Sequence, residues 1–413
     1  MSISIKQQQN TLTALYNKNP FVIKSTNIDE DNFYYLFYVN DSDGTIASLR
    51  VPSSPNGYGL IDANNITKNN VSYNFNPTPT TAESNPGCFY QYKISYGSIS
   101  DGTYDNPVST DIINGYNFVQ QLDEQIDLTE YFLNDDDKQF LTDFNDIDIV
   151  LTRSDYYTFS YINGTYTYLM SEGQTHPYSF VFKFYKTDGT MEGKTISNST
   201  ANPTIDTSTY LVNPEYGIMS VGVGVQNLIN TTFYDSTTID LAFFDDVEYY
   251  TIRAENYLYK TKESKEYTVR LKCEGYAENY QIFYLNKLGS FDAITFTTSN
   301  EKSTQIKTTT FETDPYHLND DGTYTYSEGN RGVKTLDKTI NKSLSVKSDL
   351  VVENQKPIYE AFQYSPVHIL FKNGKQTPLN LKNSTMKLVD KTAHKMYQIK
   401  YTFEYSNKNK INV

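Results

Sequence analysis

Tryptophan is absent from the 413-residue sequence, and cysteine and histidine are rare, with two and four copies. The two cysteines, Cys88 and Cys273, are too few for the disulfide framework of a small secreted domain. We expect them to be buried thiols in a reducing compartment. The histidines fall at no spacing typical of a metal site, and a surface or packing role is predicted for His176, His317, His368 and His394.

Long apolar runs are also missing, since none approaches the roughly 20 residues of a membrane-spanning helix. Residues 1–7 lack the layout of a signal peptide. We therefore expect a protein that is made in a cytoplasm and stays soluble. The sequence has no G-x-S-x-G, no G-x-x-x-x-G-K-S/T and no paired C-x-x-C, so the enzyme classes built on these motifs gain no support.

Carboxylates are plentiful, but they form no recognisable ligand or catalytic motif. The runs 135–137 and 145–148 offer oxygen ligands suited to Ca²⁺ or Mg²⁺, yet the calcium-loop pattern fails, and a solvated acidic face is the favoured interpretation. Asp292, with Glu274 or Glu278 nearby in sequence, suggests a carboxylate pair for glycoside cleavage, which sequence spacing cannot establish. An Asp after a turn more often bonds to the turn backbone.

Aromatic residues are abundant, with 38 Tyr and 23 Phe. Aromatics and Thr suit half-buried pleated surfaces, while Gly, Pro, Asn and Asp mark turns. An excess of amphipathic Tyr is also compatible with extensive protein–protein surface. The alternative is that AT-rich coding favours Tyr, Asn, Lys and Ile without any functional cause.

The net charge of −14 disfavours binding of the whole surface to nucleic acid or to an anionic membrane. The charge is uneven, because residues 331–413 hold 15 Lys and Arg against 6 Asp and Glu, whereas residues 101–160 hold 2 against 14. Opposite ends of this kind favour head-to-tail assembly between copies. Two solvated faces are the alternative.

One stretch, residues 280–296, predicts a strand, a tight turn and a second strand. Residues 281–285 are an apolar and aromatic run, and Gly289 supplies the positive φ that the turn requires. Residues 291–296 alternate as in a half-buried strand. The stretch contains packing residues and no acid–base couple, which favours a structural protein over an enzyme.

The whole chain predicts an all-β fold of consecutive β-sandwich-like domains, with short helical connectors and long polar loops. We expect an N-terminal domain with an acidic connector (1–142), a central β-sandwich domain (143–305) and a basic C-terminal domain (306–413). Strands are expected at 2–5, 20–24, 33–39, 45–51, 71–75, 88–96, 147–151, 157–161, 166–170, 178–185, 218–225, 248–252, 267–273, 367–371, 377–381, 386–389 and 396–405.

Turns and loops complete this prediction. Hairpin turns are indicated by Asp43-Gly44, Asn163-Gly164, Asp188-Gly189 and Asn373-Gly374. Helical turns are expected within 111–142 and at 359–364. Polar loops are expected at 195–209 and 313–347, the second with a hairpin at Asp321-Gly322, and both are candidate inter-subunit arms.

Three groups of motifs carry a resemblance to a known family. They are I-S-I-K-Q-Q-Q-N-T-L-T-A-L-Y-N-K-N-P-F-V-I-K with L-R-V-P-S-S-P-N-G-Y-G-L-I-D, then L-N-K-L-G-S-F-D-A-I-T-F, and finally S-P-V-H-I-L-F-K-N-G-K-Q-T-P-L-N-L with Y-Q-I-K-Y-T-F-E-Y-S-N. In order and content they resemble virion structural proteins of tailed bacteriophages of Bacteroidota, the crAss-like podoviruses among them. Related proteins often carry Trp where this chain has Tyr or Phe.

The resemblance implies a multimeric part of the tail or portal vertex (neck), such as a ring, muzzle or tail-barrel component. Its partners would be further copies of itself in a closed ring and other phage tail or portal-vertex proteins, in a virion assembled in the host cytoplasm. No enzyme activity, catalytic residue, cofactor, metal site, membrane contact or sequence-specific nucleic-acid binding is expected. The alternatives are a host-receptor or glycan-binding tail module, and an enzyme that degrades surface polysaccharide.

Overall fold

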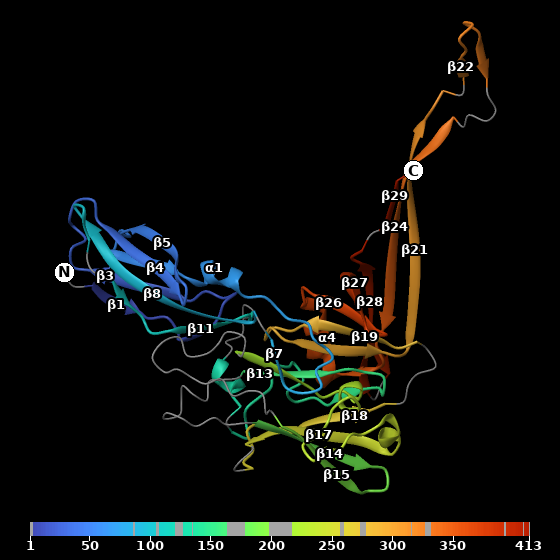
Figure 1. The fold of residues 1–413 in the computed structure, drawn as a ribbon, viewed down its shortest axis with the longest axis horizontal. Coiled ribbons are helices and arrows are strands. Elements are labelled where there is room, and N and C mark those ends of the chain that lie inside the picture. The colour runs from blue at the N-terminus through green and yellow to red at the C-terminus, as the bar shows by residue number, and fades with distance from the viewer. Residues whose placement is uncertain are drawn as a thin grey trace. The chain divides into compact units, whose positions relative to one another are not determined.

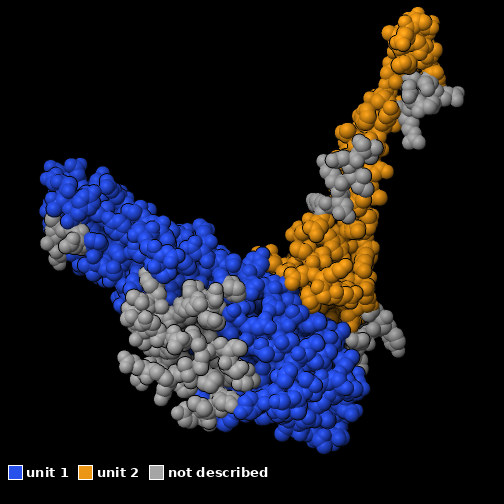
Figure 2. Space-filling model, in the orientation of Figure 1, with its two compact units in different colours: residues 1–273, 285–292 blue, residues 274–284, 293–413 orange. Residues whose placement is uncertain are grey.

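The computed structural model describes residues 3–412 apart from 86, 105–106, 120–126, 134, 163–177, 198–216, 257–259, 273–277, 315, 327–331, 392–393 and 408. The described chain consists mainly of strands with a few short helices, which confirms the predicted all-β class (Figure 1). Its contacts define two compact units (Figure 2): unit 1 comprises residues 1–273 and 285–292, and unit 2 comprises 274–284 and 293–413. The three domain boundaries stay a prediction.

Unit 1 begins with a three-stranded sheet, β1-β3-β6, and a larger sheet of order β2-β11-β8-β4-β5 to which β9 and β10 add on β8. Inward-facing aromatics such as Phe21, Tyr35, Phe37 and Tyr92 form the core between them. The elements are β1 Ile3–Gln7, β2 Leu12–Ala14, β3 Pro20–Ser25, β4 Tyr34–Asp41, β5 Gly44–Pro52, β6 Tyr58–Asp62, α1 Asn64–Thr67, η1 Lys68–Asn70, β8 Phe89–Ser100, β9 Thr103–Tyr104, β10 Val108–Ser109 and β11 Ile113–Tyr116.

Unit 1 continues with a five-stranded sheet, β12-β18-β17-β14-β15, and a three-stranded sheet, β13-β16-β7. Phe140 stacks on Phe159 with ring centroids 4.6 Å apart, and Tyr267 packs against both rings. The elements are β7 Glu83–Ser84, η2 Leu128–Tyr131, β12 Ile149–Leu151, β13 Thr158–Ile162, β14 Tyr178–Lys186, β15 Met191–Ser197, β16 Ile218–Gly222, α3 Val225–Leu228, η4 Leu241–Asp245, β17 Val247–Asn256 and β18 Tyr267–Leu271.

Unit 2 is organised by a sheet of order β20-β19-β26-β27-β28-β24-β21, with β25 on β28 and β29 on β24. Phe362 on α4 packs on its core, against Phe296, Tyr401 and Phe403. The elements are β19 Tyr280–Leu285, β20 Phe291–Phe296, β21 Ser299–Glu312, β22 Tyr316–Leu318, β23 Tyr324–Tyr326, β24 Val333–Lys347, β25 Val351–Val352, η5 Glu353–Gln355, α4 Lys356–Tyr364, β26 His368–Lys372, β27 Lys375–Lys391, β28 His394–Tyr405 and β29 Asn409–Asn412.

The stretch 280–296 forms the predicted hairpin of β19 and β20, and Gly289 has a φ of +69°. Residues 285–292, its connecting end, belong to unit 1. The expectation of a half-buried second strand was wrong, because all six residues of β20 are buried. Phe291 packs on the rings of Tyr73 and Phe75, while Phe296 packs on Phe362.

Four further expectations need correction. Residues 71–75 form no strand, because their alternating aromatics serve to pack on the Phe291 ring. Within 111–142, residues 113–116 form β11, since their backbone pairs with both β2 and β8, while the predicted helical turn exists as η2. The described residues of 313–347 lie mostly in β22, β23 and β24 and not in a loop. The expected hairpin at 162–170 falls mainly on residues outside the described part, as do His176, Cys273 and Glu274. Of the polar loop expected at 195–209, residues 195–197 are instead the end of β15, because they pair with β14, and residues 198–209 lie outside the described part.

Candidate assembly interface

A long two-stranded ribbon in unit 2, which we call the arm, is made of β21 and β24 and ends in the β22–β23 hairpin (Figure 1). Ser299 pairs with Lys347 at one end and Glu312 with Val333 at the other. The last strand, β29, pairs with Asp337–Ile340 of β24 and braces the arm from one side. Strand β21 lies at the edge of its sheet, and 13 of its 14 residues are exposed.

The local sequence explains why a polar stretch forms this ribbon. Strand β21 contains Thr304 and Thr308–Thr310, and β-branched residues favour extended backbone even where no core lies beneath them. A two-stranded ribbon in water is marginally stable by itself, and an exposed edge strand presents unpaired backbone groups to other chains. Within the part of the chain that the structure describes, β21 is paired on one side only, by β24.

The tip of the arm, residues 312–326, displays a group of aromatic side chains. The rings of Tyr316 and Tyr324 stack with centroids 5.5 Å apart, and Tyr326 packs edge-on against Tyr316 at 5.6 Å. Each of these three tyrosines, and Leu318 beside them, is more than half exposed. Exposed apolar groups gathered in this way mark interaction sites more often than scattered ones do.

Two carboxylates hold the tip in shape. Asp314 accepts hydrogen bonds from the N–H of Tyr316 and the hydroxyl of Tyr324. Asp321 accepts from the N–H and hydroxyl of Thr323, which lowers the Asp321 pKa, and Gly322 takes a φ of +80° in the turn. The predicted turn at Asp321-Gly322 is therefore confirmed.

A hollow of about 440 Å³ lies at the stem of the arm, between β21, β24 and the end of β28. Its basic residues are Lys302 and Lys342. Lys342 is exposed, and Lys302 pairs with Glu278 at 3.2 Å and lies over the ring of Tyr280. The hollow is lined by Lys302, Ser303, Thr304, Lys342, Ser343, Tyr405 and Asn407.

Glu278, which was a candidate for a catalytic pair, is held by cations and not by a second acid. Its carboxylate binds Lys372, Lys302 and the hydroxyl of Tyr280. These hydrogen bonds, that of Lys372 first, lower the Glu278 pKa to about 2. The group is thus a permanent anion on the surface of unit 2, and it is matched to the lysines around it.

Asp292, the other candidate, is 1% exposed and belongs to a buried polar network in unit 1. Its Oδ1 accepts hydrogen bonds of 2.6 Å from the hydroxyls of both Thr142 and Tyr157. Its Oδ2 accepts from the N–H of Asp143 and from Asn286 Nδ2, both at 2.8 Å. The carboxyl therefore joins the loop at 142–143, the start of β13 and the β19–β20 turn, and it is out of reach of a substrate.

Burial raises the pKa of Asp292, and the four hydrogen bonds oppose that effect. When a proton is bound it belongs on Oδ1, because hydroxyls can accept as well as donate, whereas the two partners of Oδ2 can only donate. Asn286 is fixed in turn, since its Oδ1 accepts from the N–H groups of Leu288 and Ser290. Asp292 thus bonds to the side chain of the turn residue Asn286, and it also bonds to residues that are distant in the sequence.

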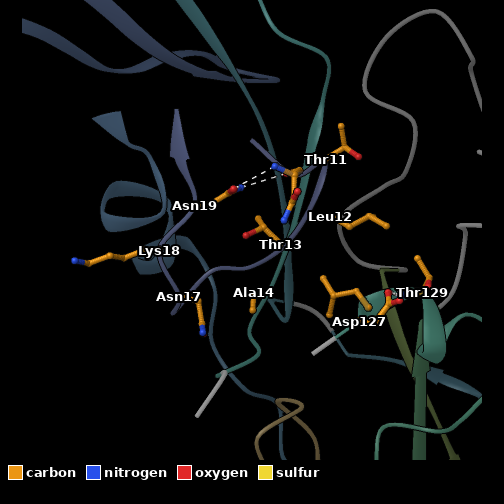
Figure 3. Close-up of a pocket in the computed structure, with 11 residues that line it drawn as sticks. Thr11, Leu12, Thr13, Ala14, Asn17, Lys18, Asn19, Asp127 and Thr129 are labelled. Carbon is orange, nitrogen blue, oxygen red and sulfur yellow. Dashed lines mark hydrogen bonds between the residues drawn. The ribbon is translucent and has the colours of Figure 1, made fainter. Parts of the chain in front are cut away.

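A polar pocket of about 370 Å³ lies beside β2 in unit 1 (Figure 3). Asn19 uses its amide to exchange two 3.2 Å hydrogen bonds with the backbone of Asn10. On another element, Asp127 caps η2 by accepting from the hydroxyl and N–H of Thr129, which lowers the Asp127 pKa. These polar groups are already used within the fold, and no aromatic side chain is among the described residues of the lining.

The acidic runs singled out in the sequence do not converge. Asp137 pairs with Lys138, Asp146 with Lys265 and Asp148 with Arg270, so their charges are partly matched one by one. Across the part of the chain that the structure describes, no group of three or more His, Cys, Asp or Glu residues is arranged to hold a metal ion.

Of the histidines and cysteines, His368 and Cys88 occupy packing positions, whereas His317 lies on the surface. His368 is buried in unit 2, its Nε2 lies 2.7 Å from the carbonyl of Phe362, and burial lowers its pKa. His317 is exposed on β22, and Cys88 is a buried free thiol whose pKa burial raises to about 11. Among the described residues, no helix is both long and apolar enough to cross a membrane.

Comparisons with known proteins leave the family open. No family model and no curated protein matches the chain. A chain in the cryo-EM structure of the anti-feeding prophage (AFP) baseplate matches at 8% identity, covering 34% of this chain and 98% of its own, with a TM-score of 0.18. The N-terminal four Ig domains of Dscam1 isoform 7.44 match at 10% identity, covering 99% and 91%, with a TM-score of 0.15. At these TM-scores neither likeness establishes a common fold or function.

Sequence reasoning predicted that residues 313–347, which include the tip and the second strand of the arm, are exposed, but it did not predict β21 and it missed the tyrosine group of the tip. The signal was present in Y-H-L-N-D-D-G-T-Y-T-Y, where aromatics alternate on both sides of an Asp-Gly turn. That pattern predicts a hairpin with one aromatic face.

Proposed function

We propose that the protein is a bacteriophage virion structural protein, a multimeric component of the tail or neck (portal vertex) assembly, and not an enzyme. The observation that carries this proposal is the arm, because a long exposed ribbon with an aromatic tip is useful mainly when other subunits cover it. The motif resemblance described above supports the same conclusion. The baseplate likeness agrees with its coarser part, a phage structural protein, but is too weak to carry it.

Two measurements test this proposal. Mass spectrometry of purified virions should detect the chain at many copies per particle, and sedimentation velocity of the purified protein should show species larger than one chain. A chain that is absent from virions and strictly monomeric at every concentration would contradict it. Cryo-EM of the intact particle would then assign its position along the tail axis.

A second function, recognition of a host receptor or glycan, is favoured by the arm tip alone. Stacked tyrosines beside Asp314, Asn319 and Asp321 combine flat apolar faces with hydrogen-bonding groups, as sugar sites require. A glycan array with wild type and with Tyr316→Ala/Tyr324→Ala would test it. Binding that survives this double substitution would exclude the tip as a glycan site.

A further inference from the structure

We propose that the tip of the arm in one copy of this chain docks into the hollow at the stem of the arm in a second copy. This contact deepens the proposed function, on which it rests, by naming both surfaces of a subunit interface. The surfaces are the aromatic tip at 312–326 and the hollow around Lys302 and Lys342.

The tip offers apolar rings within an acidic segment. Residues 308–330 contain five Asp and Glu and no Lys or Arg. Asp320 and Glu312 are exposed, so their charges lie at the surface near the exposed rings of Tyr316 and Tyr324. A partner for this surface needs positive charge around a recess that accepts a side chain.

The hollow has both properties. Lys302 and Lys342 line it, and Lys372 shares the carboxylate of Glu278 with Lys302. One carboxylate is thus bound by two of the three lysines, and Lys342 adds a further positive charge at the hollow. Glu404 on the adjacent strand β28 pairs with Ser343. Its side chain therefore projects from the face of the sheet opposite to the side chains of Lys302 and Lys342. The volume of about 440 Å³ falls within the range of natural binding pockets, roughly 300–1,000 Å³.

The tip of one chain cannot reach the hollow of the same chain. Glu312 lies ten positions after Lys302 along β21, a length of roughly 30 Å at about 3.3 Å per residue. Pairing with β24 extends over this length, with one register shift between Thr309 and Thr310, and keeps the ribbon extended. The contact therefore joins two copies, and because the two surfaces differ it is head-to-tail, the kind that closes into a ring or extends as a filament.

Charge exchange between the two surfaces provides the test. In the first variant, Glu312→Lys and Asp320→Lys reverse charge at the tip, while Asp314→Asn and Asp321→Asn remove charge but keep the oxygen that holds each turn. In the second, Lys302→Glu and Lys342→Glu reverse the charge of the hollow. A matched control reverses two exposed lysines of unit 2 that do not line the hollow, Lys382→Glu and Lys400→Glu.

Sedimentation velocity of the full chain should show self-association for wild type and for the control variant. Each charge-reversed variant alone should associate at least about 100-fold more weakly, because like charges then meet. An equimolar mixture of the two variants should regain association, since each positive surface again finds a negative one. The wild-type contact should also weaken between low and high salt.

Three results would overturn the inference. Either charge-reversed variant could associate as wild type does, or the mixture could fail to recover, and in both cases the multimeric function stands while this contact is wrong. A wild-type chain that stays monomeric at all concentrations would overturn the contact and the multimeric function together. Unchanged far-UV circular dichroism in each variant shows that the loss is not one of folding.

Discussion

The hydroxyl of Tyr157 donates a 2.6 Å hydrogen bond to the buried carboxyl of Asp292, although 135 residues separate the two in sequence. Burial of a carboxyl group costs free energy, and the cost is larger when its oxygens have no hydrogen-bond partners. The pair therefore makes the β19–β20 turn and the start of β13 depend on each other. Asp292 is used for architecture in this chain.

Two substitutions of Asp292 should distinguish the loss of its hydrogen bonds from the loss of its charge, as measured by the free energy of unfolding. Asp292→Ala leaves two N–H donors buried without an acceptor and should lower the free energy of unfolding by about 3–5 kcal/mol. Asp292→Asn should lower it by only about 1 kcal/mol, because its oxygen can face Asp143 and Asn286 while its NH₂ donates to the two hydroxyls. Urea denaturation followed by tyrosine fluorescence measures both, and equal losses would contradict the assigned geometry.

His368 should make unit 2 sensitive to acid. Its pKa is lowered in the fold from the ordinary value of 6.5, so the unfolded chain takes up the proton first. The stabilisation is present above about pH 6.5 and is lost as pH falls below it towards the folded pKa. After correction for the intrinsic pH dependence of amide exchange, the exchange of the β26 amides should become faster as pH falls through that window. His368→Gln, which keeps a donor for the Phe362 carbonyl but does not titrate, should remove this acceleration; an identical profile in both proteins would refute the prediction.

Gly289 should tolerate no side chain. It has a φ of +69°, and a Cβ there would meet Oδ1 of Asn117 at 2.2 Å. Gly189, also in unit 1, has a φ of +83° with nothing within 4 Å of the same position. Gly189→Ala should therefore cost about 1–2 kcal/mol for backbone strain alone, and Gly289→Ala a further 1–3 kcal/mol or so for crowding. Equal unfolding midpoints for the two variants would contradict the close packing at Gly289.

The accuracy of sequence reasoning follows the range of the interactions. Turns such as Asp43-Gly44 and Asn373-Gly374 were predicted correctly, because the residues that set a hairpin are adjacent in sequence. The strand expected at 71–75 was wrong, because the alternating aromatic residues Tyr73 and Phe75 pack against the distant Phe291 and do not belong to a sheet. The partners of Asp292 outside its own turn, Thr142, Asp143 and Tyr157, were not predictable, because they are 135 to 150 positions away from it in the sequence.

The arm shows a different limit. Its residues are polar, and polarity was interpreted as a loop, whereas pairing between β21 and β24 needs no apolar face when both sides meet solvent or another subunit. Composition indicated exposure correctly, but the register over 14 pairs depends on a partner strand beyond a tip of some 20 residues.

Sedimentation velocity of an arm-shortened chain tests the central claim most directly. Residues 310–336 are replaced by Asn-Gly, so that Thr309 and Asp337, which already pair, flank a two-residue turn and the pairing of β24 with β29 is kept. We predict that the wild type forms species larger than one chain, and that the shortened chain sediments as a monomer with unchanged circular dichroism. A shortened chain that assembles as the wild type does would contradict the role of the arm in assembly.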